Sequence, residues 1–193
     1  MRRRQPSFGL GEIFNCRLWL RLFDMDKSVL LFLLLFSLCS VTVAQRRYST
    51  YTNNRYVFSV DYPTDLLTPS KIEDASNSGE IFYSKNNEVE MRVWGEYNAL
   101  FRTWRQEYDF EINGFGSKPT FTVLKPGWFV ISGLKDGKIY YQKTLRRTLL
   151  QRDGNMDIFY TLTIEYPKSK NSKIDPLVKR ISASFKFDPT ADV

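Results

Sequence analysis

Histidine is absent from this chain of 193 residues, and cysteine occurs only as Cys16 and Cys39. Without histidine, the chain cannot form a serine–histidine or cysteine–histidine nucleophile or a histidine-ligated zinc site. Both cysteines lie in a segment that we expect to be removed, so the remaining protein has no disulfide and no CxxC redox pair. The sequence therefore predicts no catalytic residue, no metal ligand and no cofactor.

The chain also lacks an apolar run of about 20 residues, the length that a membrane-spanning helix needs. Its longest apolar stretch, Val29–Leu38, follows the positive charge of Lys27. Small residues, Thr42 and Ala44, stand three places and one place before Gln45. This pattern predicts a secretory signal that is cleaved between Ala44 and Gln45. The alternative is an uncleaved segment that anchors the protein to a membrane.

Residues 1–24 fit neither a compact signal nor a folded domain, and we predict that Met25 is the true start. We expect residues 1–44 to be leader and signal, 45–54 a flexible lead-in, 55–187 a single domain and 188–193 a tail. After cleavage about 150 residues remain, which is the usual size of one domain. The net charge of +7 belongs partly to the leader, so attraction to anionic surfaces is weak.

The first half of the expected domain has the alternation of a half-buried sheet. The pattern predicts a strand at 56–62 and a hairpin at 80–97 with its turn at Asn86-Asn87. A long loop, 63–79, separates the two. Asn98 is typical of a helix N-cap. The apolar stripe of the predicted helix, which ends at Asn113-Gly114, consists of Leu100, Phe101, Trp104 and Tyr108.

The second half reads as a meander of strands at 121–124, 128–134, 138–149 and 157–166. Asp136-Gly137 and Asp153-Gly154 have the composition of tight type I′ turns. Asp175-Pro176 predicts the start of a last helix, with Asp175 as N-cap. The expected fold class is α+β, an antiparallel sheet flanked by helices.

Two short motifs at the ends of this region resemble those of PsbP-like domains. The first is Tyr56-Val57-Phe58-Ser59-Val60-Asp61-Tyr62-Pro63, and the second is a strand closing in Tyr166-Pro167 before a helix that runs into Ile181–Phe185. The family includes an extrinsic photosystem II subunit, a nuclear Ran-release factor and many exported bacterial proteins. The resemblance implies an α/β/α sandwich and a domain that docks to partners, and it transfers no site residues.

A possible partner surface lies on the strand 89–97. Alternation places Arg92, Trp94 and Glu96 on one face, opposite Val89, Met91 and Val93. A tryptophan on an otherwise charged face is expected to be exposed, and exposed tryptophans are common in binding hot spots. Arg92, Trp94 and Glu96 are therefore the candidate partner surface, with the loop 63–79 nearby.

Other chemistry is conceivable for three sets of residues. Glu88, Glu90 and Glu96 share a strand face and suggest a divalent cation, although ligands two places apart lie about 7 Å from each other. Asp61 and Glu165 would suit a carboxylate-based hydrolase if their strands were neighbours. A basic strip along 138–148 is too weakly charged to predict nucleic-acid binding.

The sequence thus predicts an exported protein, periplasmic or extracellular, that has no stable membrane span after cleavage. Its predicted function is that of a non-catalytic accessory module that docks to a protein partner in the cell envelope and binds no nucleic acid. The first alternative is an exported protein that binds a small molecule or a divalent metal.

Overall fold

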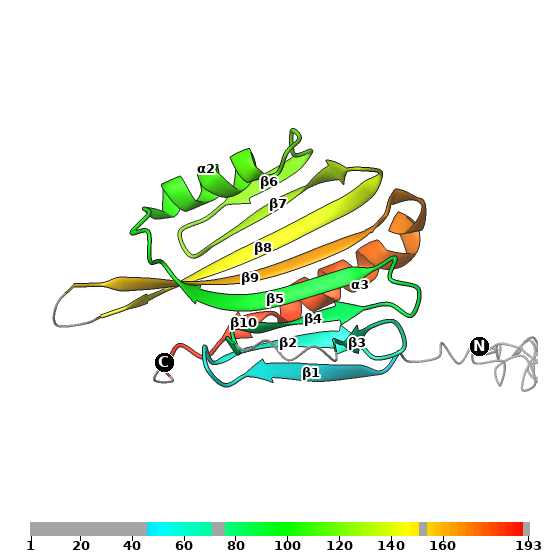
Figure 1. Cartoon of the computed structure of the whole chain (residues 1–193), viewed down its shortest axis with the longest axis horizontal. Coiled ribbons are helices and arrows are strands. Elements are labelled where there is room, and N and C mark those ends of the chain that lie inside the picture. Colours follow the sequence, from blue (N-terminus) through cyan, green and yellow to red (C-terminus); the bar gives the residue numbers. More distant parts are fainter. Residues whose placement is uncertain (1–45, 71–75, 151–153, 191–193) are drawn as a thin grey trace, which may run out of the picture. The chain divides into compact units, whose positions relative to one another are not determined.

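The computed structural model describes residues 46–70, 76–150 and 154–190 (Figure 1). A compact unit runs from Arg46 to the end of the chain. The predicted signal, the start at Met25, the cut after Ala44 and the end of the tail lie outside the described residues. Within the described ranges, no helix has the length and apolarity to cross a membrane.

A seven-stranded antiparallel sheet forms the middle of the domain. Its strand order is β3-β4-β5-β9-β8-β7-β6. The strands are β3 (Thr68–Pro69), β4 (Gly79–Tyr83), β5 (Glu90–Tyr97), β6 (Phe121–Leu124), β7 (Trp128–Lys135), β8 (Lys138–Leu149) and β9 (Met156–Pro167). The positive φ angles of Asp136 and Gly137 confirm the predicted tight turn between β7 and β8. Of the second predicted turn, Asp153 lies outside the described residues.

A second, three-stranded sheet has the order β1-β2-β10 and consists of β1 (Tyr48–Asn53), β2 (Phe58–Pro63) and β10 (Lys186–Phe187). Residues 45–54 were expected to be a flexible lead-in, but β1 pairs with β2 from Tyr48 opposite Pro63 to Asn53 opposite Phe58. The side chain of Asn53 is buried, accepts a hydrogen bond from Tyr56 N at 2.8 Å and so fixes the turn between the strands. The polar composition of β1 reflects its position at a sheet edge.

The first helix, α2 (Trp104–Gly114), begins six residues later than the predicted cap at Asn98. Its N-cap is Thr103, which forms a capping box with Gln106: the Thr103 hydroxyl accepts from Gln106 N, and the Gln106 side chain accepts from Thr103 N. Leu100 and Phe101 therefore lie outside the helix, contrary to the sequence prediction.

The second helix, α3 (Asn171–Ser184), follows a short 3₁₀ turn, η2 (Lys168–Lys170), and begins four residues before the predicted cap. Pro176 lies inside the helix. Asp175 does not cap, because its carboxylate accepts a hydrogen bond from the Tyr166 hydroxyl at 2.6 Å. A tertiary contact thus occupies the group that the local sequence would assign to the helix start.

The two faces of the seven-stranded sheet carry separate cores. On one face, the sheet packs against α3 and the three-stranded sheet, and α3 passes behind the sheet in Figure 1. On the other face, α2 covers a smaller cluster of Tyr108, Phe115, Phe129 and Ile131. The predicted α+β class, an antiparallel sheet flanked by helices, is confirmed, and the three-stranded sheet is an addition that the sequence prediction did not contain.

Candidate functional site

The three predicted surface residues lie on the α2 side of β5. Val89, Met91 and Val93 are buried in the larger core, and the alternation of the strand turns Arg92, Trp94 and Glu96 to the opposite face. Arg92 is exposed and forms an ion pair with Glu90. Trp94 is half-buried, and its indole Nε1 donates to Glu96 Oε1 at 3.2 Å. The predicted alternation along β5 is therefore confirmed, although Trp94 is less exposed than expected.

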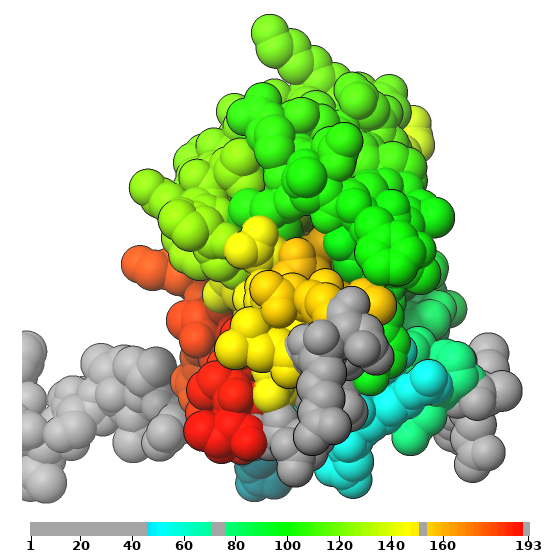
Figure 2. All heavy atoms as spheres, turned by 90° about the vertical axis from the view of Figure 1, so that its left-hand side faces the viewer, coloured from blue at the N-terminus to red at the C-terminus, as the bar shows by residue number. Residues whose placement is uncertain are grey.

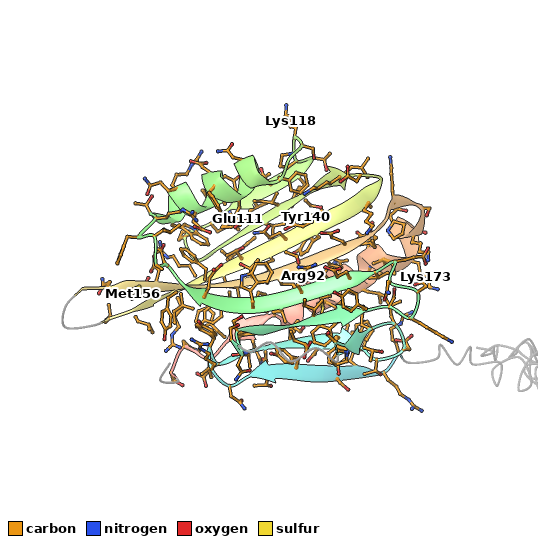
Figure 3. All side chains as sticks on the ribbon, in the orientation of Figure 1. Arg92, Glu111, Lys118, Tyr140, Met156 and Lys173 are labelled. Atoms are coloured by element: carbon orange, nitrogen blue, oxygen red, sulfur yellow. The ribbon has the colours of Figure 1, made fainter. Side chains whose placement is uncertain are left out.

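A layer of hydrogen-bonded polar side chains continues this face beneath α2. Gln142 on β8 is buried and donates from Nε2 to Glu111 Oε2 on α2 at 3.0 Å. The Tyr140 hydroxyl donates to Gln142 Oε1 at 2.8 Å, and the buried hydroxyls of Thr144 and Thr161 lie 3.2 Å apart. Figure 3 labels Arg92, Tyr140 and Glu111, which come from β5, β8 and α2.

The electrostatics of this layer follow from its burial. Burial raises the pKa of Glu111, the hydrogen bond from Gln142 lowers it, and the nearby carboxylates of Glu107 and Glu96 raise it further. Burial also raises the pKa of Tyr140, with Glu111 and Glu165 as smaller causes. The hydrogen bond to Glu90 raises the pKa of Arg92. Tyr140 therefore stays neutral at physiological pH and acts as a hydrogen-bond donor.

Exposed apolar side chains add to the site where β5 ends. Among the described residues, large exposed apolar side chains fall into two groups. One group lies on or next to the connection from β5 to α2 and consists of Tyr97, Leu100, Phe101 and Phe110, and Leu150 is exposed separately after the end of β8. The other group lies along β6 and β7, on the face of the sheet that α3 covers, and consists of Phe121, Trp128 and Leu134.

Leu100 and Phe101 are the large apolar residues of the β5–α2 connection, with 68% and 76% of their surface accessible. Phe101 has a φ of 50°, an uncommon conformation for a bulky residue. Such backbone strain persists only where the surroundings enforce it, and it clusters at functional sites. The connection therefore presents two apolar side chains in a conformation that the rest of the fold imposes.

A buried asparagine holds this connection in place. Asn98 N donates to Asp157 O at 2.9 Å, which ties the loop to β9. The Asn98 side chain accepts from Arg102 N at 3.0 Å and donates to Arg102 O at 2.7 Å. Arg102 in turn pairs with Glu107 and lies over the ring of Phe110, 3.6 Å from its centroid. The loop is thus clamped at both ends.

Figure 2 looks onto this end of the domain, where green atoms of the β5–α2 segment lie above yellow and orange atoms of β8 and β9. Leu150, which is 85% exposed, follows Leu149 at the end of β8. We use the term docking surface for Arg92, Trp94, Glu96, Leu100 and Phe101. Sequence reasoning missed Leu100 and Phe101, although the capping-box pattern of Thr103 and Gln106 places the helix start after them.

The other candidate chemistry finds no assembled site. Glu88 pairs with Lys170, Glu90 with Arg92, and Glu96 accepts from Trp94. Within the described ranges, no three acidic, histidine or cysteine side chains are grouped as metal ligands.

Asp61 and Glu165 belong to different sheets, since β2 neighbours β1 and β10 whereas β9 neighbours β5 and β8. The condition for a carboxylate pair is therefore not met. The expected basic strip on β8 is interrupted because Gln142 and Thr144 are buried, and its Arg146 lies near Asp157, with an Nε–Oδ2 distance of 3.9 Å.

Comparison with known proteins matched the structure but not the sequence. No family model and no curated protein sequence matches the chain. The solution structure of cyanobacterial PsbP (CyanoP) from Synechocystis is 14% identical, with a TM-score of 0.42, over 76% of this chain and 96% of that chain. The Ran-binding protein Mog1p from Saccharomyces cerevisiae is 7% identical, with a TM-score of 0.45, over 74% and 96%.

Proposed function

We propose that this protein is a non-catalytic accessory module that binds a protein partner through the docking surface. The observation that carries the proposal is the clamped β5–α2 connection, which follows the strand of Trp94 and exposes Leu100 and Phe101. Exposed apolar groups on a rigid support lose little conformational entropy when they bind. Aromatic anchors with a polar surrounding are the usual composition of a hot spot, and here Arg92 and Glu96 supply the polar part.

The absence of catalysis is part of the same proposal. The chain has no histidine, and the one carboxylate pair considered for hydrolysis is divided between two sheets. The polar layer beneath α2 consists of paired side chains whose hydrogen bonds connect α2 to the sheet. This layer lies on the same face of the sheet as Arg92, Trp94 and Glu96.

We further propose that the protein is exported and meets its partner in the cell envelope or outside the cell. The support is the signal pattern that ends at Ala44, together with the start of the compact unit at Arg46, the second residue after the expected cut. Mass spectrometry of the protein isolated from its host tests this point. A mature N-terminus at Gln45 is expected, and a peptide from residues 1–24 would contradict it.

In the partner experiment, the tagged protein is cross-linked to its neighbours in envelope extract, and mass spectrometry identifies the cross-linked partner. The partner is then purified, and its affinity for the wild type and for each variant is measured. Phe101→Asn removes the aromatic ring and keeps a residue that tolerates the positive φ. Loss of a hot-spot aromatic costs about 2 kcal/mol, or about thirtyfold in affinity. We expect this loss for Phe101→Asn and a similar one for Trp94→Ala.

Phe121→Ala is the matched control, because Phe121 is also an exposed aromatic residue but lies on the opposite face of the sheet. Its affinity for the partner should equal that of the wild type. Equal binding by all variants would refute the docking surface, and equal loss in all variants would indicate non-specific apolar association.

A further inference from the structure

The second group of exposed apolar residues lines a groove on the face opposite the docking surface. α3 covers β9 and β8 with Ile174, Val178 and Ile181 and leaves part of β6 and β7 open. A cavity of about 700 Å³ lies along this margin and adjoins one of about 300 Å³. The two share Phe121, Tyr141, Lys143 and Ser182, so they form one continuous groove. Its size is typical of small-molecule sites.

The walls of the groove are largely apolar. Phe121 and Leu134 are 56% and 41% exposed along its β6–β7 side, and Val178 faces it from α3. Trp128, 37% exposed, lines the smaller part. Three large exposed apolar residues gathered along one cavity favour an apolar ligand, since scattered exposure is the ordinary pattern.

Positive charge is concentrated at the same place. Lys143, Lys168 and Lys179 line the groove, against a single carboxylate, Asp175, which already accepts a hydrogen bond from Tyr166. Among the described residues, the hydrogen bond recorded for the Lys143 ammonium is its donation to Ser182 O at 2.6 Å. An ammonium group has three N–H donors, so two remain for a ligand.

The charge of Lys143 is partly shielded from water. It is half-buried on the core side of β8, and burial lowers its pKa. Its bond to Ser182 O satisfies a carbonyl in the last turn of α3, which is a structural role. That structural role accounts for one of the three N–H donors of Lys143. It does not account for the exposure of Phe121 and Leu134, which line the same groove.

We propose that the groove binds a small amphiphilic acid, whose carboxylate contacts Lys143 and Lys179 and whose apolar chain lies along Phe121 and Leu134. The lysines select the carboxylate, because an anion next to Lys143 compensates a charge that burial disfavours. The aromatic and aliphatic walls bind the chain. This site is independent of the docking surface, and its test does not depend on a protein partner.

Isothermal titration of the full-length chain with dodecanoate, below its micelle concentration, tests the proposal, and dodecanol is the neutral ligand of equal chain length. We expect saturable one-to-one binding of dodecanoate and at least tenfold weaker binding of dodecanol. Phe121→Ala should weaken dodecanoate binding about tenfold, because it removes much of the apolar contact. Lys179→Glu should weaken the binding of dodecanoate but not that of dodecanol.

Two variants serve as matched controls. Lys173→Glu changes an exposed lysine at the beginning of α3 (Figure 3), which is not among the residues that line the groove. Phe101→Asn removes an exposed aromatic residue of the docking surface. Both should bind dodecanoate like the wild type, and both carry the same leader as the other variants. Equal binding of dodecanoate and dodecanol, or an unchanged affinity in Phe121→Ala, would overturn the proposal. Binding to anionic vesicles without binding of free dodecanoate would also overturn it, in favour of a membrane surface.

Discussion

The two faces of the seven-stranded sheet are covered by different chemistry. On the α3 side, Met91, Val93, Leu162 and Ile164 are almost fully buried against α3 and the three-stranded sheet. On the α2 side, the buried residues of β8 and β9 include Gln142, Thr144, Thr161 and Thr163. The first face depends on apolar burial, and the second joins α2 to the sheet partly by hydrogen bonds, each of which contributes only about 1 kcal/mol net.

This difference separates stability from binding. We infer that the α3 side provides most of the free energy of folding, so that the α2 side can carry polar groups and a surface loop without loss of the fold. Changes on the α3 side should therefore affect unfolding as a whole, whereas changes on the α2 side should act locally on α2 and the loop before it.

The largest expected effect comes from truncation of one aromatic residue in each core. Phe58 is 1% exposed and contacts the rings of Tyr160 and Phe185, with centroid distances of 5.8 and 6.1 Å. Phe58→Ala should lower the free energy of unfolding by about 3–5 kcal/mol. Phe129, which packs under Trp104 and Tyr108, lies in the smaller core. Phe129→Ala should fall at the lower end of that range, since α2 can move onto the cavity.

Denaturant unfolding measures both losses, and hydrogen exchange locates them. Phe129→Ala should reduce the protection of α2 amides more than that of β9 amides. Phe58→Ala should reduce both together, because it acts on global unfolding. Equal behaviour of α2 in the two variants would show that the faces are not separable.

A medium effect is expected at Gly95, the one position of β5 where the larger core excludes any side chain. A methyl group there would lie 2.7 Å from Cβ and Cγ of Tyr56. Gly95→Ala should therefore destabilise the domain by about 1–3 kcal/mol. Gly127→Ala is the control, since a methyl group at Gly127 meets nothing within 4 Å. A neutral Gly95→Ala variant would mean that Tyr56 can move without cost.

These contrasts show which parts of the fold could be predicted from sequence. Strands were predictable where the signal is local. The alternation of apolar residues predicted β5 and β8, and Asp136-Gly137 predicted the turn between β7 and β8. β1 was missed because its polar face is accounted for only by its pairing with β2. The start of α3 was misplaced because Asp175 binds Tyr166, a contact that local sequence does not reveal.

The candidate site was predictable to the same extent. Alternation placed Arg92, Trp94 and Glu96 on one face, and that depends only on strand geometry. The exposure of Leu100 and Phe101 depends on Asn98 and its bond to Asp157, a residue far along the chain. Their apolar character resembled a helix stripe, so the sequence favoured burial where the structure shows exposure.

A smaller and local effect is expected from the helix cap. Thr103→Ala removes the hydroxyl that accepts from Gln106 N and should cost about 1 kcal/mol. Hydrogen exchange should show the loss in the first turn of α2, with β9 unchanged. Thr122→Ala, at an exposed threonine of β6, is the control and should stay within about 0.5 kcal/mol of the wild type. Loss of protection throughout the domain would contradict the independence of the α2 side.

The smallest effect should come from the charge of Glu111 and should depend on pH. Its pKa in the folded protein is raised, first by burial and also by Glu107 and Glu96, while Gln142 and Arg102 oppose the shift. A raised pKa means that Glu111 contributes stability below its ordinary pKa, and that this contribution is lost as the pH rises through the folded value.

Glu111→Gln keeps an oxygen that accepts from Gln142 and removes the charge. The variant should therefore melt above the wild type at pH 7, and the two melting temperatures should converge at pH 4. Since each kcal/mol corresponds to about 2–4 °C in a domain of this size, melting curves at both pH values measure the difference directly. A gap that stays constant between pH 4 and pH 7 would show that the charge of Glu111 has no part in the stability of the α2 side.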